Sequence, residues 1–270
     1  TNRVSVLSTG LNIDPIVVVQ KAVPGLYSDI SSVEIDTYLA ETAAALTVEH
    51  PDYSYLAARI KVNSLHKETP GFIIATKNLY DDGLLREDYY KKVMENADLI
   101  ESVIDYDKDY TFDYFALTTL IRAYLLKFDN KTIERPQDLW MRVTLTVTGN
   151  EFNLDKIKET YKSLSTGMYT HATPTLFNSG LKMQQLSSCF LIGMEDDSIE
   201  GIFNTIKDCA LISKTAGGIG MHAHNIRGSG SRIKSTNGKS NGLIPFLKIF
   251  NETAKSCLLY TSDAADDCWS

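Results

Sequence analysis

The sequence predicts an α/β protein with an α-rich N-terminal half. Three observations support this prediction. Apolar residues recur at helical spacing through most of the chain up to Gly180. Beyond Gly180, two short apolar runs flank one amphipathic helix, which is the pattern of a strand, a helix and a strand. Glycine-rich loops without acidic residues then follow.

Residues 1 to about 70 are expected to form a small helical unit. Ser31 and Glu34 match a capping box, and the apolar residues after them recur at helical spacing: Ile35, Leu39, Ala43 and Leu46. Pro51 opens a second helix. Its apolar face would carry Tyr53, Leu56, Ala57 and Ile60. The sequence 69–71, Thr-Pro-Gly, would close the unit.

Residues 73–180 are predicted to be mainly helical. Residues 80–112 are expected to form connecting helices, and residues 114–126 a buried helix. Pro136 would begin a helix over 137–147, and residues 154–165 would form another.

The character of the chain changes after Gly180. Residues 185–192 are expected to form a buried strand, and Asp197-Ser198 would cap the helix after it. Gly217-Gly218 would end that helix in the left-handed conformation. Residues 219–226 would form a second strand, which makes a parallel β–α–β unit with a right-handed crossover. A last helix is expected over 244–255.

One segment suggests an anion-binding site. The 43 residues from 209 to 251 contain no Asp or Glu. Their cations are Lys214, Arg227, Arg232, Lys234, Lys239 and Lys248. Glycines let backbone N–H groups approach an anion, and the helix that begins near Ser198 adds its dipole. A phosphate-bearing ligand is one interpretation, and ordinary solvated loops are the other.

Two other site patterns fail on context. Residues 218–223 match the dinucleotide fingerprint G-x-G-x-x-A, but the glycines would follow a helix and open a strand, whereas the fingerprint requires the reverse order. His171, His222 and His224 do not make a metal set, because no carboxylate or third ligand lies near the last two. We therefore expect no metal site.

The cysteines indicate a reduced protein. Four cysteines without a C-x-x-C pair are not a disulfide scaffold, and this usage is typical of the cytoplasm. Cys189 follows two serines on a predicted strand, so it is either a redox thiol or inert core. Cys209 lies among apolar helix residues, and we expect it in the core.

Composition and termini exclude several classes. The net charge of -7 argues against general binding to nucleic acid or to a membrane surface, and no apolar run reaches the length of a membrane helix. The start shows no signal-peptide layout and no initiator Met, so we expect residues upstream of Thr1. Residues 257–270 fit nothing before them, and we interpret them as an artefactual tail.

Several motifs together resemble one family, the large catalytic subunit of class I ribonucleotide reductase of the eukaryotic type. The similar segments are 170–178, 185–191, 196–202, 213–220 and 236–242. Upstream, residues 25–28 and 65–69 resemble the ATP-cone of that family. The resemblance implies a truncated ATP-cone over 1–72, a helical region over 73–180, and the first strands of a ten-stranded α/β barrel over 181–256.

The family is an oxidoreductase that reduces ribonucleoside diphosphates to 2′-deoxyribonucleoside diphosphates by radical chemistry, for DNA precursor synthesis and replication. By resemblance, Cys189 is one member of the redox-active cysteine pair, which cycles through a disulfide. Thr173 and Ser188 match positions that contact the substrate. The remaining catalytic cysteines lie outside this chain, so we expect the fragment alone to be inactive.

The resemblance also implies allosteric control by nucleoside triphosphates. The specificity effector, a deoxynucleoside triphosphate with Mg²⁺, would be bound by Asp197, Ser198, Ile199, Lys214, Arg227, Lys234 and Ser235. The activity effector, ATP or dATP, would be bound by Ser32, Asp36 and Lys67. The residues that normally open the cone are absent from this sequence.

The implied partners are the small radical-generating subunit, which would hold the radical cofactor, other large subunits, and thioredoxin or glutaredoxin as reductant. No cofactor of its own, no nucleic acid and no membrane are expected for this chain. An alternative hypothesis is a nucleotide-binding regulatory module without redox activity.

Overall fold

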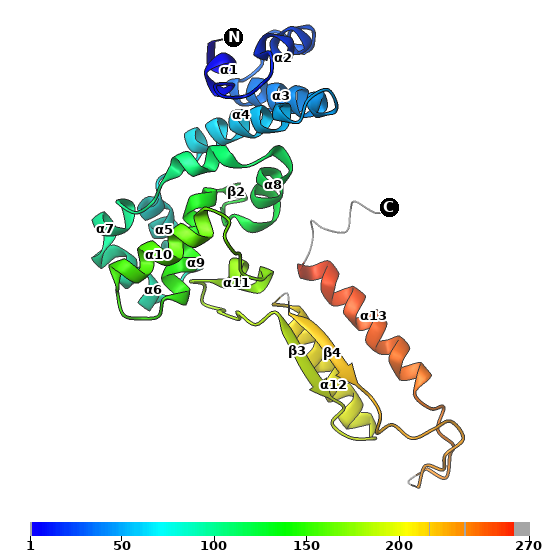
Figure 1. Cartoon of the computed structure of the whole chain (residues 1–270). Coiled ribbons are helices and arrows are strands. Elements are labelled where there is room, and N and C mark those ends of the chain that lie inside the picture. The colour runs from blue at the N-terminus through cyan, green and yellow to red at the C-terminus, as the bar shows by residue number, and fades with distance from the viewer. Residues whose placement is uncertain (1, 216, 235, 262–270) are drawn as a thin grey trace. The chain divides into compact units, whose positions relative to one another are not determined.

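The computed structural model describes residues 2–215, 217–234 and 236–261, the last five of these by their backbone alone. The chain forms two compact units (Figure 1). The first contains residues up to 170 together with 179–184, and the second contains 171–178 and the residues from 185 onward. Among the described residues, no helix is both long enough and apolar enough to cross a bilayer.

The first unit opens with a helical layer. Its elements are α1 (Asn2–Leu7), α2 (Pro15–Ala22), η1 (Val23–Gly25), α3 (Ser32–Ala45), η2 (Leu46–Val48) and α4 (Asp52–Glu68). The predicted capping box is confirmed: the Glu34 N–H donates to Ser31 Oγ at 3.2 Å, and the Ser31 N–H donates to Glu34 Oε2 at 2.9 Å. The predicted face of α4 is buried, with Leu56 and Ala57 fully inaccessible. Helix α3 packs against α4, and this face of α4 lies in the hydrophobic core between them.

The rest of the first unit is helical, as predicted. Its elements are α5 (Phe72–Asp81), α6 (Glu87–Glu95), α7 (Ala97–Glu101), η3 (Tyr106–Thr111), α8 (Tyr114–Thr119), η4 (Leu120–Tyr124), β1 (Lys127–Phe128), β2 (Lys131–Thr132), α9 (Pro136–Val147) and α10 (Leu154–Ser165). Proline has no N–H to donate, and the first residue of a helix has no partner within the helix for one. Pro136 therefore suits the first position of α9, and the predicted start of this helix is confirmed. Helix α9 is buried on nearly every side.

The prediction of one buried helix over 114–126 is wrong. Helix α8 ends at Thr119, and a π-helical turn follows to Tyr124. A π turn adds residues per turn and so shifts later side chains off the helical stripe. Of this segment only Leu117 and Leu125 are buried, whereas Phe115 is 79% exposed.

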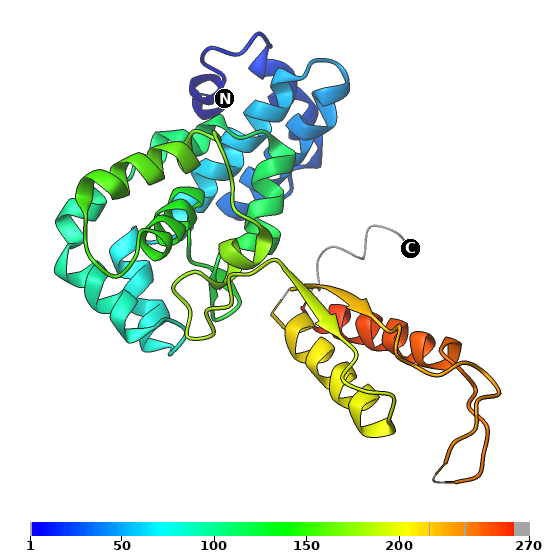
Figure 2. The ribbon, with the colours of Figure 1, turned by 60° about the horizontal axis from the view of Figure 1, so that its bottom comes forward.

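The second unit contains the predicted β–α–β unit. Its elements are α11 (Thr173–Asn178), β3 (Cys189–Gly193), α12 (Ile199–Ser213), β4 (Gly218–His222) and α13 (Ile244–Thr261). Strands β3 and β4 are parallel, with Cys189 opposite Gly218 and Gly193 opposite His222. Helices α12 and α13 lie on the same face of this pair (Figure 2). Gly218 opens a strand, so the dinucleotide fingerprint is in the wrong context, as argued above.

Three details of this unit were predicted wrongly. The first strand begins at Cys189 and is not buried: its residues alternate between half-buried and exposed, because helices cover only one face of the described pair. Leu191 is 94% exposed. Helix α12 ends at Ser213, and neither Gly217 nor Gly218 has a positive φ. Instead, a Cβ on Gly217 would lie 2.8 Å from Ile212 Cγ2. The second strand ends at His222, short of the predicted 226.

Helix α13 covers the predicted last helix and continues to Thr261, into the segment interpreted as an artefactual tail. Residues 262–270 of that segment lie outside the described residues.

Candidate nucleotide site and exposed cysteine

A cavity of about 670 Å³ lies in the second unit. It is lined by the turn before α12, the chain after β4, a hairpin described over residues 228–234 and 236–242, and the start of α13. Its lining residues are Asp197, Ser198, Ile199, Ile202, Arg227, Ser231, Arg232, Ile233, Lys234, Ser240 and Phe246. Parallel α/β sheets bind ligands outside the carboxyl ends of their strands, and this cavity follows the ends of both β3 and β4.

The N-terminal end of α12 forms one wall of the cavity. Ser198 caps the helix, because its Oγ accepts from the Gly201 N–H at 3.0 Å, and its hydroxyl donates to Asp196. Gly201 is required here: a Cβ would overlap the Asp196 carboxylate and lie 2.8 Å from the Asp196 nitrogen. The positive end of the helix dipole therefore faces the cavity.

Arg227 connects the chain after β4 to the turn before α12, and both segments line the cavity. Its Nε donates to Asp197 Oδ2 at 2.5 Å, its backbone N–H donates to the same oxygen at 3.2 Å, and its Nη2 donates to the Asp197 carbonyl at 2.9 Å. Both side chains are partly buried, at 35% and 26% exposure. This pair fixes where the Asp197 carboxylate lies.

A hairpin forms the opposite wall. Its arms are held by three backbone hydrogen bonds of 2.8 Å, from Gly230 to Ser240, from Ser240 to Ser231, and from Ile233 to Gly238. Arg232 and Lys234 project from this hairpin, and within the described part of the chain neither has an ion-pair partner. With Arg227 and Asp197, they give the cavity three positive charges and one negative charge.

Five of the seven predicted specificity-effector residues therefore line one cavity. Lys214 does not join them. It follows α12 at its C-terminal end, about 24 Å along the helix from Ser198 at 1.5 Å per residue. Ser235 lies outside the described residues.

The predicted substrate and redox residues lie in the same unit. Cys189 is an exposed free thiol at the start of β3, on the face of the strand pair that no described helix covers. Ser188 is exposed, and its carbonyl accepts from the Gly218 N–H at 2.7 Å. Thr173 is half-buried at the start of α11.

Helix α11 is hydrogen-bonded to the segment that precedes β3. Thr175 Oγ1 donates to the Leu186 carbonyl at 3.0 Å, and Asn178 Nδ2 donates to the Gln185 carbonyl at 2.8 Å. These bonds connect the element that carries Thr173 to the residues just before Ser188.

The other cysteine and histidine predictions can be compared directly. Cys209 is buried in α12 at 9% exposure, as expected. His222 and His224 stack, with Nδ1 atoms 2.8 Å apart. The described residues contain no group of three or more His, Cys, Asp or Glu side chains that could hold a metal ion.

The predicted activity-effector residues converge in the first unit. Ser32 and Asp36 lie one turn apart on α3, and Lys67 Nζ lies 3.8 Å from Asp36 Oδ2. The structure adds Arg3, which pairs with the buried Asp36 carboxylate and which sequence reasoning missed. No local spacing signals this contact, because Arg3 lies in α1 and Asp36 in α3, with α2 between them in the chain.

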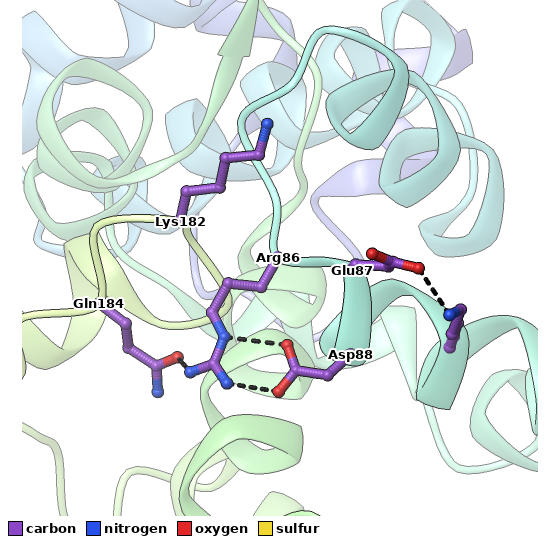
Figure 3. A pocket seen from close by; sticks show the side chains of 6 residues that line it. Arg86, Glu87, Asp88, Lys182 and Gln184 are labelled. Carbon is purple, nitrogen blue, oxygen red and sulfur yellow. Dashed lines mark hydrogen bonds and ion pairs between the residues drawn. The ribbon is translucent and has the colours of Figure 1, made fainter.

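A second hollow, of about 700 Å³, lies on the first unit. Its charges mostly neutralise one another: Arg86 donates to Asp88 and to Gln184, and Lys91 pairs with Glu87 at 2.6 Å (Figure 3). In the same view Lys182 points away from Arg86. We assign this hollow no role, whereas Arg232 and Lys234 in the cavity of the second unit have no ion-pair partner among the residues that the structure describes.

The cavity also contains residues that the sequence analysis did not assign to a site: Ile202, Ser231, Arg232, Ile233, Ser240 and Phe246. Arg232 was noted only as one of the cations in the acid-free segment. That composition was the available signal, but it could not say which cations reach the cavity.

A parallel β–α–β unit with a cation-lined cavity at the carboxyl ends of its strands is typical of nucleotide-binding α/β proteins. Comparison with known proteins is more specific. A model of the ribonucleotide reductase all-alpha domain matches residues 110–184, and a model of the ribonucleotide reductase barrel domain matches residues 187–258. The chain belongs to the ribonucleotide reductase large-subunit family.

Several curated relatives align with nearly the whole chain. Ribonucleoside-diphosphate reductase large chain 2 of Saccharomyces cerevisiae is 47% identical over 268 residues, 94% of this chain and 31% of the relative. The large chain of Schizosaccharomyces pombe and the large subunit of Arabidopsis thaliana are each 46% identical, over 94% of this chain and 33% of each relative. The chain thus spans about a third of the length of these relatives.

Proposed function

We propose that the full-length protein is the large, catalytic subunit of a ribonucleoside-diphosphate reductase. It reduces ribonucleoside diphosphates to 2′-deoxyribonucleoside diphosphates for DNA precursor synthesis. The observation that carries this proposal is the pairing, in one unit, of a cation-lined cavity with an exposed thiol on β3. The relatives named above, which align over 94% of the chain, support it.

Cys189 is proposed as one member of the redox-active pair. Two thiols together give up two electrons and two protons as they become a disulfide, and the substrate loses its 2′-hydroxyl as water. The second thiol and the thiyl radical that removes the 3′ hydrogen belong to residues beyond this chain. An exposed thiol on an uncovered strand face suits this role, because a reductant such as thioredoxin or glutaredoxin must restore the pair.

The cavity of the second unit is proposed to bind a deoxynucleoside triphosphate as specificity effector. Its volume lies within the range of small-molecule sites. Mg²⁺ would be held mainly by the phosphates and water, since its coordination rarely depends on a protein cage and the described residues offer no carboxylate cluster. Asp36, Ser32, Lys67 and the added Arg3 are proposed to contact ATP or dATP in an ATP-cone.

The wider assembly is also a proposal. Strands β3 and β4 would be the first strands of a ten-stranded barrel. Exposed apolar side chains on one stripe of α12, at Ile199, Phe203 and Leu211, favour self-association of large subunits. The radical cofactor would belong to the small subunit. The two described cysteines are free thiols, which agrees with a cytoplasmic location.

The test is Cys189→Ser in the full-length protein. We expect loss of turnover with a thiol reductant, while deoxynucleoside triphosphate binding stays within about twofold of the unsubstituted protein. Full turnover in this variant would refute the redox role and favour a regulatory module that binds nucleotides without redox chemistry.

A further inference from the structure

The segment 185–188, which precedes β3, forms neither helix nor strand. Each of its four backbone carbonyls nevertheless accepts a hydrogen bond. The donors are Asn178 Nδ2 to Gln185, Thr175 Oγ1 to Leu186, Gln185 Nε2 to Ser187, and the Gly218 N–H to Ser188. Three of these four donors are side chains, so particular residues hold the segment in place. Cys189 follows it directly, and the conformation of the segment therefore decides where that thiol lies.

Both ends of the Gln185 side-chain amide are used. Its Oε1 accepts from the Ser187 N–H, and its Nε2 donates to the Ser187 carbonyl at 2.9 Å and to Thr215 Oγ1 at 3.3 Å. The Thr215 hydroxyl is able to accept, because it donates its own proton to the Ile212 carbonyl at 2.8 Å. An amide turned the other way would place its NH2 group against the Ser187 N–H and its oxygen against the Ser187 carbonyl. Only one orientation of Gln185 therefore satisfies all three bonds.

The peptide that Gln185 holds lies directly before Ser188 and Cys189. Both of these residues are exposed, so their positions depend on the backbone that carries them. Two thiols form a disulfide only when their Cα atoms are about 4–7 Å apart and their Cβ atoms face each other. A displacement of about 1 Å at a reacting group is enough to lower a rate about a hundredfold.

We propose that Gln185 is a positioning residue for the redox centre: its amide holds the Ser187 peptide so that Ser188 and Cys189 stand in place for substrate reduction. This inference rests on the proposed redox role of Cys189. It adds no chemical step. Cys189 and its partner thiol still give up two electrons and two protons as their disulfide forms, and the substrate takes these up as its 2′-hydroxyl leaves as water.

The experiment compares the full-length protein with its Gln185→Met variant, which keeps the length of the side chain and removes all three bonds. The pre-reduced protein, with its small subunit, carries out a single turnover without added reductant. The deoxynucleotide formed is measured together with the fraction of Cys189 in a disulfide, by mass spectrometry of the Cys189 peptide. We expect the variant to form both at least about tenfold more slowly, because the thiol is less often in place.

A second readout is the equilibrium of the disulfide with a dithiol buffer. A looser segment loses more conformational freedom when the disulfide closes, so disulfide formation in Gln185→Met should be about tenfold less favourable. For a two-electron couple this raises the reduction potential by about 30 mV. A residue that only supports the fold would leave this potential unchanged.

Gln184→Met is the matched control. It replaces the neighbouring glutamine, whose Oε1 accepts from Arg86 in the first unit and makes none of the bonds to Ser187 described above (Figure 3). Its rate and potential should equal those of the unsubstituted protein. In both Met variants the Kd for a deoxynucleoside triphosphate should stay within about twofold. If Gln185→Met does not fold, Gln185→Glu is measured in the same way: it keeps the acceptor for the Ser187 N–H but loses the donor, and a loss of about threefold is expected.

The outcomes separate the two proposals. If the unsubstituted protein forms deoxynucleotide while Cys189 stays reduced, the proposed redox role is wrong. If Cys189 is oxidised with turnover but the Gln185 variant matches Gln184→Met in rate and potential, the redox role stands and the positioning role is wrong. A Gln185 variant that loses effector affinity and thermal stability together with turnover would show a general structural role, and this result would also overturn the inference.

Discussion

Arg142 and Glu134 form an ion pair in the interior of the first unit, and replacing Arg142 with Met tests how much that pair matters. The two side chains are 2% and 3% exposed. Arg142 donates to both carboxylate oxygens, at 2.5 and 3.1 Å, and to the Ser179 carbonyl at 2.8 Å. Methionine fills similar space but makes none of these bonds, so Glu134 would remain as a buried charge without its partner.

Breaking a buried pair in this way costs about 3–5 kcal/mol. The loss should be visible as a lower thermal midpoint of the full-length protein, followed by calorimetry. The double variant Arg142→Met with Glu134→Gln should recover about 1–3 kcal/mol of that loss, because the lone charge is gone. Lys91→Met breaks the exposed pair with Glu87 and is the control, with an unchanged midpoint expected. A single variant as stable as the control would refute this reasoning.

Two other predictions concern one residue of each unit. Burial raises the pKa of the Asp138 carboxyl to about 7, although the Tyr106 hydroxyl opposes this at 2.7 Å. Between about pH 4 and 7 the folded chain therefore keeps a proton on Asp138 that the unfolded chain has lost. The stability that this proton contributes is fully present below pH ~4 and is lost as the pH rises to 7. That part of the unfolding free energy is about 4 kcal/mol. Asp138→Asn should flatten pH-dependent unfolding by this amount; an unchanged profile would contradict it. In the second unit, Gly201→Ala places a Cβ against Asp196 and should weaken deoxynucleoside triphosphate binding at least about fivefold. Gly228→Ala, whose Cβ meets only Ser231 Oγ at 3.9 Å, should not, and equal Kd values for the two variants would count against the cavity.

Features that depend on neighbouring residues in the sequence could be predicted. The capping box at Ser31, the proline start of α9 and the bounds of α10 over 154–165 all follow from local chemistry. The order of strand, helix and strand in the second unit was also predictable, because each element carries its own apolar pattern.

Features that depend on distant contacts could not be predicted. The exposure of β3 depends on which elements cover its faces, and the end of α12 depends on how Gly217 packs against Ile212. The pair between Asp197 and Arg227 joins residues 30 positions apart, and no spacing rule selects Arg227 over the neighbouring cations. Lys214 is an effector residue by resemblance, and no local pattern indicates that the length of α12 separates it from the cavity within this chain.

Hydrogen exchange of the full-length protein, with and without a saturating deoxynucleoside triphosphate, tests the nucleotide site most directly. If the cavity holds the nucleotide, the backbone amides of the first turn of α12 and of hairpin residues 228–234 and 236–242 should exchange at least about tenfold more slowly when it is bound. Saturated binding that protects neither segment would contradict the account.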